Sequence, residues 1–383
     1  MRTRFWIHSA MLVAASAIAA ALAVASAEAQ QFSPWSAPVN LNNLPGCPAV
    51  VNSTSDDQHP AISKDGLSLY FTSNRPGGSG NFDLWVTQRD SLDDCWLPPV
   101  NLGPGVNTPS LESAPNLTTD GHWLYFHSKR PTWITADGVE VANCGGVEAD
   151  LYVSHRQDKR DDLGWEAPIN LGCTINTPGF DHAGPTYFED DTTGTHFLYF
   201  TVRPFGASDV LFDIYVSTCI ADLAACNTQG LWGPGIPVDA LNNTPDNKEY
   251  RNTRTAIRRR DGLEMILSSG RPGSLASENL WVSTRPVVTL DQQNWSAPVP
   301  INCDWLPTLP QYLQCLPHPP DVAQVNSNAF DGAPALSWDG TELYFFSKRT
   351  DLPGHIAGIS PTGDGTENSD LYVSRRMKLT GPN

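Results

Sequence analysis

Several signatures that mark common enzyme classes are absent from this sequence of 383 residues. It contains no Gly-x-Ser-x-Gly, His-Glu-x-x-His, P-loop or dinucleotide-binding fingerprint, which argues against the enzyme classes that these motifs identify. No Cys-x-x-Cys pair occurs among the eight cysteines, so neither a zinc ribbon nor a thioredoxin-like site is indicated. Helical periodicity is also missing over any substantial length, which argues against an α-helical fold.

Basic residues are scarce relative to acidic ones. The sequence has 24 Lys and Arg against 41 Asp and Glu, a formal net charge of −17 at pH 7. Binding to a nucleic-acid backbone or to an anionic membrane surface depends on Lys and Arg, so we expect neither kind of partner. The surface suits cations, basic partners or neutral ligands.

Long apolar runs are limited to the N-terminus. Two arginines precede an Ala-rich apolar run over residues 10–27, and Ala27-Glu28-Ala29 supplies the small-x-small pattern of a signal-peptidase site. We therefore predict a signal peptide over residues 1–29 and an exported domain over residues 30–383; the alternative is an N-terminal membrane anchor. The expected location is the periplasm or the cell exterior, with no membrane span after cleavage.

One sequence block recurs five times in the predicted domain. It consists of an Asp-Gly turn, an aromatic strand that ends near an Arg, an Asp-hydrophobic-aromatic-Val strand, and a Trp with a nearby Pro. The Asp-hydrophobic-aromatic-Val segments are Asp83-Leu84-Trp85-Val86, Asp150-Leu151-Tyr152-Val153, Asp213-Ile214-Tyr215-Val216, Asn279-Leu280-Trp281-Val282 and Asp370-Leu371-Tyr372-Val373. Each block holds four short strand-like runs between turns, which is the content of one β-propeller blade.

The fifth block lacks its Trp segment at the C-terminal end, and a matching segment stands at the N-terminus. Residues 32–39 match the Trp-Ser-Ala-Pro-Val of residues 295–299. We predict that the N-terminal segment forms the outer strand of the last blade beside residues 370–375, which closes the ring and removes a free sheet edge. The expected fold is an all-β, five-bladed propeller with four-stranded antiparallel blades.

The repeated elements resemble a known repeat family. Asp-Gly, Leu-Tyr-Phe-Ser-x-Arg-Pro-Gly-Gly, Asp-Leu-Tyr-Val-Ser and Trp-x-x-Pro are similar to the WD40-like PD40 β-propeller repeats, which are related to the periplasmic TolB propellers. The resemblance covers essentially the whole domain. It implies the propeller fold and an envelope or extracellular setting, and it does not single out a function.

Long insertions gather on one face of the predicted propeller, which carries the inter-blade connections and the turns between second and third strands. They fall within residues 131–149, 204–212, 303–330 and 350–369. Long loops on one rim of a rigid scaffold commonly build a binding site. Trp305 or Tyr312 would offer a ligand a stacking surface there.

Acidic residues recur at the predicted entrance to the innermost strands of the same face. They follow an Asn-Ser or Asn-Thr pair by five residues, and they are Asp57, Glu112, Asp181 and Asp331. The fourth blade departs from this pattern with Glu249, Tyr250 and Arg251, and the third adds His182. Propeller geometry would bring these side chains together around the axis.

Converging carboxylates admit three interpretations. Mutual repulsion raises some of their pKa values, which suits acid and base roles in glycoside hydrolysis. Oxygen ligands also suit Ca²⁺, and an acid that recurs in four blades can equally be architectural and cap the strand-entry turn. For an enzyme, the catalytic candidates are Asp57, Asp181, Glu249 and Asp331. The ligand-binding candidates are Glu112, His182, Tyr250, Arg251, Trp305 and Tyr312.

A second set of acids has a structural interpretation. One Asp and one Arg per blade stand on adjacent predicted strands, which predicts structural ion pairs or turn caps. The acids are Asp83, Asp150, Asp213 and Asp370, and the arginines are Arg75, Arg130, Arg203 and Arg349. The Trp of each block is expected in the core.

An even number of cysteines in an exported chain allows disulfides. The first two expected pairs close short loops and the third joins adjoining segments: Cys219–Cys226, Cys303–Cys315 and Cys144–Cys173. The topology places Cys47 and Cys95 on opposite faces, so we expect no bond between them.

Two functional hypotheses follow. The main one is an exported, non-catalytic propeller that binds a glycan or an envelope protein with its insertion-rich face. The alternative is a glycoside hydrolase that uses the axial carboxylates, by analogy with five-bladed sugar-cleaving propellers. Two carboxyl groups about 5–9 Å apart in an open pocket would favour hydrolysis, whereas carboxylates tied individually into backbone turns would favour binding. Apart from Ca²⁺, no cofactor is expected.

Overall fold

The computed structural model describes most of the chain in two units. The described residues are 31–134, 139–144, 148–208, 211–244, 249–301, 304–305, 315–316, 325–355 and 368–379. The larger unit spans residues 34–377. In the smaller unit Phe32 forms an antiparallel bridge with Lys378. The predicted signal peptide lies outside the described residues.

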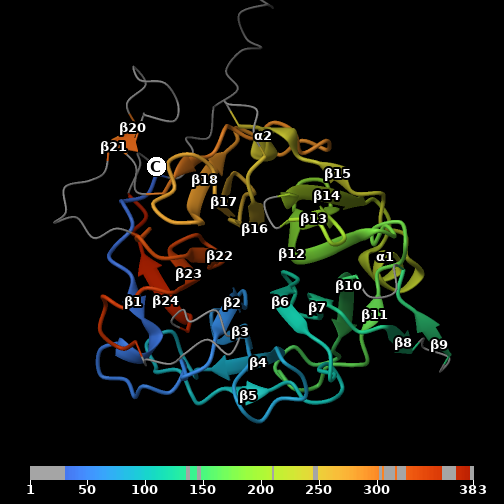
Figure 1. Ribbon diagram of the computed structural model, residues 1–383, viewed down its shortest axis with the longest axis horizontal. Coiled ribbons are helices and arrows are strands. Elements are labelled where there is room, and N and C mark those ends of the chain that lie inside the picture. The colour runs from blue at the N-terminus through green and yellow to red at the C-terminus, as the bar shows by residue number, and fades with distance from the viewer. Residues whose placement is uncertain are drawn as a thin grey trace, which may run out of the picture. The chain divides into compact units, whose positions relative to one another are not determined.

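The larger unit contains five four-stranded sheets. Figure 1 shows them around a common axis, with β2, β6, β12, β16 and β22 innermost. Neighbouring strands in every sheet are antiparallel. The predicted five-bladed propeller with four-stranded antiparallel blades is confirmed.

The blades follow one another in chain order. Blade one contains β2 (Asp57–Ile62), β3 (Ser68–Ser73), β4 (Asp83–Gln88) and β5 (Val100–Asn101). Blade two contains β6 (Glu112–Leu117), β7 (Trp123–Ser128), β10 (Asp150–His155) and β11 (Ile169–Asn170). Blade three contains β12 (Phe180–Asp190), β13 (Thr195–Pro204), β14 (Asp213–Cys219) and β15 (Ile236–Pro237). Blade four contains β16 (Asn252–Ile257), β17 (Glu264–Ser269), β18 (Asn279–Thr284) and β19 (Val299–Pro300). Blade five contains β22 (Asp331–Leu336), β23 (Glu342–Ser347), β24 (Asp370–Arg375) and β1 (Val39–Asn40).

Short elements lie in the connections between these strands. They are η1 (Leu41–Asn43), β8 (Thr132–Ile134), β9 (Glu140–Ala142), α1 (Leu223–Gln229), α2 (Asp239–Asn242), β20 (Asp304–Trp305) and β21 (Cys315–Leu316). Helix α1 begins after Asp222, whose carboxylate accepts hydrogen bonds from two N–H groups of the first turn, and it ends at Gly230 with φ of 65°. Within the described part of the chain, no helix has the length and apolar character needed to span a membrane.

The hydrophobic core lies between the blades. In β3, Leu69 and Phe71 belong to a cluster shared with blade five, whereas Tyr70 belongs to the cluster shared with blade two. This division follows from the period of two in a strand, which points neighbouring side chains to opposite faces. Each of the five blade interfaces holds one such cluster. A blade is therefore apolar on both faces and depends on two neighbours for burial.

The N-terminal segment closes the ring as predicted. Val39 and Asn40 pair with Val373 and Tyr372 of β24. In four blades an Arg lies over the Trp that precedes the outer strand, a cation–π contact. The pairs are Arg89–Trp96, Arg156–Trp165, Arg285–Trp295 and Arg376–Trp35, with guanidinium-to-ring distances of 4.4, 4.4, 4.1 and 4.2 Å. The N-terminal Trp35 thus occupies in blade five the position that Trp96 has in blade one.

An asparagine side chain joins each blade to the next. Its amide oxygen accepts from the N–H, and its amide nitrogen donates to the C=O, of one residue in the third strand of the preceding blade. The pairs are Asn107–Leu84, Asn176–Leu151, Asn242–Ile214, Asn326–Leu280 and Asn52–Leu371. In the fourth connection this residue is Asn242, one position before the Asn243 of the sequence pattern. We call this contact the asparagine clasp.

Among the described residues three disulfides are formed, Cys47–Cys95, Cys144–Cys173 and Cys219–Cys226. The second and third confirm the sequence predictions. The predicted pair Cys303–Cys315 involves Cys303, which lies outside the described residues. Disulfide bonding is consistent with an extracellular or secreted protein.

The expectation that Cys47 and Cys95 remain unpaired is wrong. The strand directions are as predicted, but the connection between β1 and β2 does not stay on the insertion-rich rim. Its residues Leu44 and Val50 pack against the cluster that contains Trp96, the neighbour of Cys95. The connection therefore follows the side of blade one towards the turn between β4 and β5, where Cys47 meets Cys95.

Deleting residues 31–43 removes β1 and Trp35, so we expect a clearly lower melting temperature and a tendency of the exposed β24 edge to self-associate. Thermal circular dichroism and size-exclusion chromatography measure the two effects. A synthetic peptide of residues 31–43 should restore much of the melting temperature by strand addition, and a scrambled peptide should not. An unchanged melting temperature after the deletion would contradict the role assigned to ring closure.

Candidate functional site

The predicted axial carboxylates are buried in ion pairs within their own blades. Each accepts from the arginine at or just beyond the end of the second strand. The pairs are Arg75–Asp57, Arg130–Glu112, Arg203–Asp181 and Arg349–Asp331, with N···O distances of 2.5, 3.2, 2.5 and 2.6 Å. The carboxylate-bearing side chains are at most 3% exposed. An isolated charge at such a depth would be very costly, and the arginine makes it tolerable.

Asp331 shows how the local sequence holds such a carboxylate. It accepts hydrogen bonds from the N–H and Oγ of Ser327, at 2.5 and 2.9 Å, and from the Oγ of Ser347 at 2.6 Å. Arg349 also donates to the carbonyl of Val325. The serine of the Asn-Ser pair thus forms a turn that the acid four residues later caps. Burial raises the pKa of Asp57 and Glu112, and the paired arginine offsets part of the rise.

These contacts correct the interpretation of Asp57, Asp181 and Asp331 as an open axial site. Each of the three side chains is engaged by an arginine of its own blade, and the cavity on the axis is lined by other residues. The architectural interpretation of these acids is the one the contacts support. Within the described residues, no group of three or more His, Cys, Asp or Glu side chains could hold a metal ion. Calcium binding stays a prediction.

In blade four the equivalent position is occupied by Asn252 rather than by an acid. Its Oδ1 accepts from Ser269 Oγ at 2.8 Å and from Arg271 at 2.7 Å. Blade four thus departs from the acidic pattern, and its equivalent residue lies three positions after Glu249. Glu249 is exposed in the connection before β16, where Tyr250 and Arg251 are half-buried.

His182 of blade three is fully buried and has a structural contact. Its Nε2 accepts from the N–H of Thr177 at 3.2 Å and lies 3.1 Å from the Oγ1 of the same residue. Burial lowers the pKa of His182 to about 4, so the ring is neutral at pH 7. His182 thus caps the turn that Asp57 caps in blade one, and it is unsuited to an exposed ligand.

Three of the four acids that begin third strands are capped by an asparagine of the outer strand of the same blade and do not pair with the predicted arginines. Asp83 accepts from Asn101 Nδ2 at 3.0 Å and from the N–H of Gly80 at 3.0 Å. Equivalent bonds join Asn170 to Asp150 and Asn40 to Asp370, both at 2.8 Å. The turn-cap interpretation is confirmed in these three blades, and the predicted ion pairs with Arg75, Arg130, Arg203 and Arg349 are wrong.

Asp213 of blade three lacks an asparagine on its own outer strand, and its hydrogen-bond partner is Asn252 of blade four instead. Pro237 takes the outer-strand position of Asn101, opposite Tyr215 in the ladder. Blade four also has a proline there, but its third strand begins with Asn279, which is uncharged. Among the five blades, only blade three therefore keeps the acid after losing the outer-strand donor. This departure from the repeat makes Asp213 a functional candidate.

Asp213 and Glu249 line one cleft of about 180 Å³ on the insertion-rich face. Its other lining residues are Phe180, Val202, Pro204, Leu211 and Tyr215. Burial raises the pKa of Asp213, and the charge of Glu249 adds to the rise, whereas a hydrogen bond with Asn252 lowers it. Phe180 is 38% exposed, so its ring is available to a ligand. The cleft combines two carboxyl groups in different environments with an aromatic wall.

The sequence prediction found Glu249 and missed Asp213 as a site residue. The outer strands of blades one and two end in Pro-Val-Asn and Pro-Ile-Asn, whereas blade three has Gly-Ile-Pro at residues 235–237. The replacement of this asparagine by proline is visible in the sequence. Its significance becomes clear only once the structure shows that the asparagine caps the acid. The side chain of Trp305 and the whole of Tyr312 lie outside the description, so their stacking role stays a prediction.

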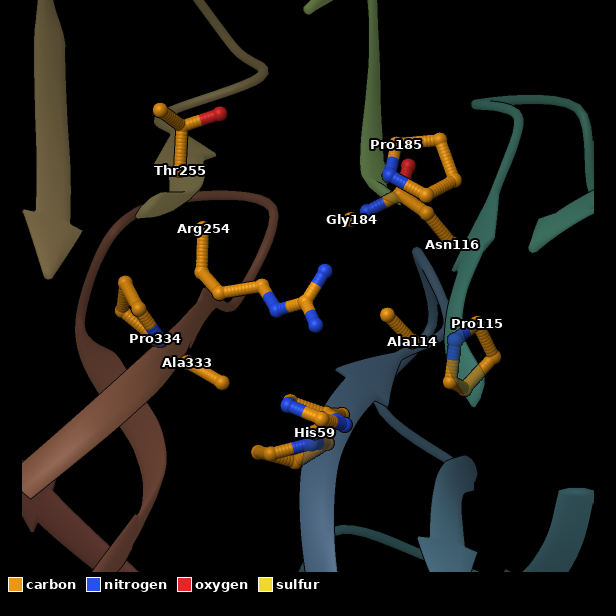
Figure 2. A pocket seen from close by; sticks show the side chains of 11 residues that line it. His59, Ala114, Pro115, Asn116, Gly184, Pro185, Arg254, Thr255, Ala333 and Pro334 are labelled. Carbon is orange, nitrogen blue, oxygen red and sulfur yellow. The ribbon is translucent and has the colours of Figure 1, made fainter. Parts of the chain in front are cut away.

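A second cavity, of about 20 Å³, lies on the axis and is lined by all five inner strands (Figure 2). Each inner strand contributes one residue with positive φ at a β-bulge. These are His59, Ala114, Gly184, Arg254 and Ala333, with φ of 50°, 55°, 58°, 44° and 47°. No acid is among its lining residues.

Comparison with known proteins finds the fold but no sequence family. No family model matches the chain, and no curated protein matches it in sequence. In structure it is similar to an α-L-arabinofuranosidase from Lactobacillus brevis, at 16% identity over 86% of this chain and 94% of that one, with a TM-score of 0.51. A Coprinopsis cinerea GH62 α-L-arabinofuranosidase catalytic domain aligns at 11% identity over 90% and 98%, with a TM-score of 0.47.

These neighbours correct the main functional hypothesis. The neighbour from Lactobacillus brevis is described as an enzyme that acts on a glycan, which contradicts the main hypothesis of a non-catalytic propeller that binds a glycan or an envelope protein and agrees better with its alternative. At this identity the likeness establishes the five-bladed fold. The choice of catalytic residues therefore depends on the geometry of this chain.

If the axial acids are structural, two substitutions of Asp331 should lower the free energy of unfolding by different amounts. Replacing Asp331 with Leu leaves the 4% exposed Arg349 without its carboxylate and should lower the free energy of unfolding by about 3–5 kcal/mol. Asp331→Asn should cost much less, because Asn252 fills the same role beside Arg271 in blade four. Urea denaturation of both variants measures the difference. Equal stabilities would refute the architectural role.

Proposed function

We propose that the chain is a glycoside hydrolase whose catalytic carboxyl groups are Asp213 and Glu249. The observation on which this depends is the retained acid of blade three, which lacks the outer-strand asparagine found in blades one, two and five and shares a cleft with a second acid. Repetition explains the other acids as architecture, whereas these two depart from the repeat.

The different environments of Asp213 and Glu249 suit them to different catalytic roles. Asp213 is half-buried and its raised pKa favours the protonated form, which suits a general acid that donates to the glycosidic oxygen. Glu249 is exposed, so its carboxylate can act on a water molecule or on the sugar carbon. Two carboxyl groups held in different environments are the recurring arrangement for such chemistry.

The cleft suits a sugar in other respects. Phe180 and Tyr215 provide aromatic surface, and apolar walls with a few polar groups are usual for small-ligand sites. The small volume fits a terminal sugar unit better than the middle of a chain. Because the structural neighbour from Lactobacillus brevis is described as an α-L-arabinofuranosidase, aryl arabinofuranosides are the first substrates to test.

The cellular setting is part of the proposal. Signal-peptide export to the periplasm or cell exterior places the chain where glycans occur, and the disulfides support an oxidising location. The resemblance to PD40 repeats agrees with such a setting. A glycan is accordingly the proposed partner.

Hydrolysis of a panel of aryl glycosides tests the proposal. The wild-type protein should release the aryl group, and Asp213→Asn or Glu249→Gln should lower kcat/KM by at least about 100-fold, the usual scale of acid–base catalysis. Activity should also fall as pH rises through the raised pKa of Asp213, because the acid form is required.

The matched control is Asp90→Asn, an exposed aspartate in the turn between β4 and β5 on the opposite face. It should hydrolyse at the wild-type rate. Asp213→Asn should also be at least as stable as wild type at neutral pH, because ionisation of a buried group with a raised pKa costs stability above that pKa. Full activity of both cleft variants would sink the proposal.

A further inference from the structure

Arg254 on the axis carries a charge that no described residue pairs. No hydrogen bond or ion pair joins its guanidinium to the rest of the described chain, and its Nη1 is buried without a partner. Figure 2 shows the guanidinium reaching from β16 across the channel towards Gly184. A buried donor that finds no acceptor is costly, so this arrangement calls for a ligand with negative charge.

The channel is shaped to admit this side chain. A Cβ added at Gly184 would lie 2.2 Å from Arg254 Nη1, so only glycine leaves the guanidinium its place. Gly184 also has φ of 58°, a conformation that other residues rarely adopt. The ring of bulge residues is thus small at Ala114, Gly184 and Ala333 and long at Arg254, which fills the space they leave.

A second unpaired donor lines the same cavity. Thr255 is 6% exposed, and its hydroxyl has no partner among the described residues. The other four blades have proline after the bulge, a residue with neither a hydroxyl nor an N–H: Pro60, Pro115, Pro185 and Pro334. Blade four therefore differs from its repeats by adding two donors, Arg254 and Thr255, at one place.

Nearby charges do not neutralise Arg254. Burial lowers the pKa of Arg254, and the charge of Glu278 acts in the opposite direction and raises it. However, that carboxylate already forms an ion pair with Arg251, whose Nε lies 2.9 Å from Oε2, and it accepts a hydrogen bond from Thr253 Oγ1 at 2.6 Å. Burial and the charge of Arg254 lower the pKa of His59, so this ring is neutral and able to donate an N–H. The axis is thus locally positive in a chain with a net charge of −17.

We infer that the axial cavity binds one monatomic anion of the halide class, with chloride as the expected occupant, held by Arg254 and Thr255. The volume of about 20 Å³ admits one water-sized species. Phosphate, sulfate and carboxylates are larger, which excludes them from the cavity as it stands. The site is independent of the Asp213–Glu249 cleft, so it does not depend on the proposed hydrolysis.

Thermal unfolding of the purified chain in sodium chloride, bromide and gluconate at constant ionic strength tests this inference. Chloride and bromide should raise the melting temperature of the wild-type protein by about 2 °C or more over gluconate, and the rise should grow with halide concentration. Crystals grown or soaked in bromide should show an anomalous peak beside Arg254 and Thr255.

Two variants test whether the halide effect depends on Arg254 and Thr255. Arg254→Met removes the charge at similar length, and Thr255→Val removes only the hydroxyl; both should fold, and the first should lose the halide dependence while the second weakens it. The control Arg260→Met changes an exposed arginine outside the cavity and should keep the full dependence. A wild-type melting temperature that is the same in all three salts, a bromide-soaked crystal with only water in the cavity, or an unchanged halide response in Arg254→Met would each overturn the inference.

Discussion

The asparagine clasp is the contact on which the propeller depends. A blade with two apolar faces cannot persist alone, so burial drives blades together, but burial is non-directional and does not set their spacing. The asparagine clasp sets this spacing, because one asparagine side chain hydrogen-bonds to both the N–H and the C=O of a single residue in the preceding blade. It recurs at all five junctions, including Asn52 to Leu371, which are 319 residues apart. Ring closure is therefore made by the same chemistry as every other junction.

Repetition divides the polar residues of this chain into architecture and function. An acid that contacts an equivalent arginine, serine and turn in successive blades is explained by its role in the fold, even where its residue type would suit catalysis. Function is instead indicated where a blade changes one member of a set and keeps the others. Asp213 without its outer-strand asparagine, and Arg254 at a bulge position where three other blades have Ala or Gly, are both of this kind, and they arise in neighbouring blades three and four.

The fold could be predicted from the sequence because it depends on periodicity, which is local and repeated. The alternation of Leu69, Tyr70 and Phe71 and the displaced Trp35 segment are visible without coordinates. The site could not be predicted in the same way. Which arginine meets Asp57, and which asparagine meets Asp83, depends on side-chain direction across strands that are separated in sequence. The prediction that Cys47 and Cys95 stay unpaired is wrong for a related reason. The path of a long connection depends on how it packs, and the order of the strands does not determine that path.

Blade four links the two departures physically. Its inter-blade connection supplies Glu249 to the cleft, and the same lengthened connection shifts the strand entry so that the neutral Asn252 stands where other blades have an acid. Losing that acid removes a negative charge from the inner end of the blade, where Arg254 then leaves the axis positive. The altered connection before β16 therefore places Glu249 in the cleft on the rim and leaves the charge of Arg254 in the axial channel. For this reason both candidate sites involve blade four.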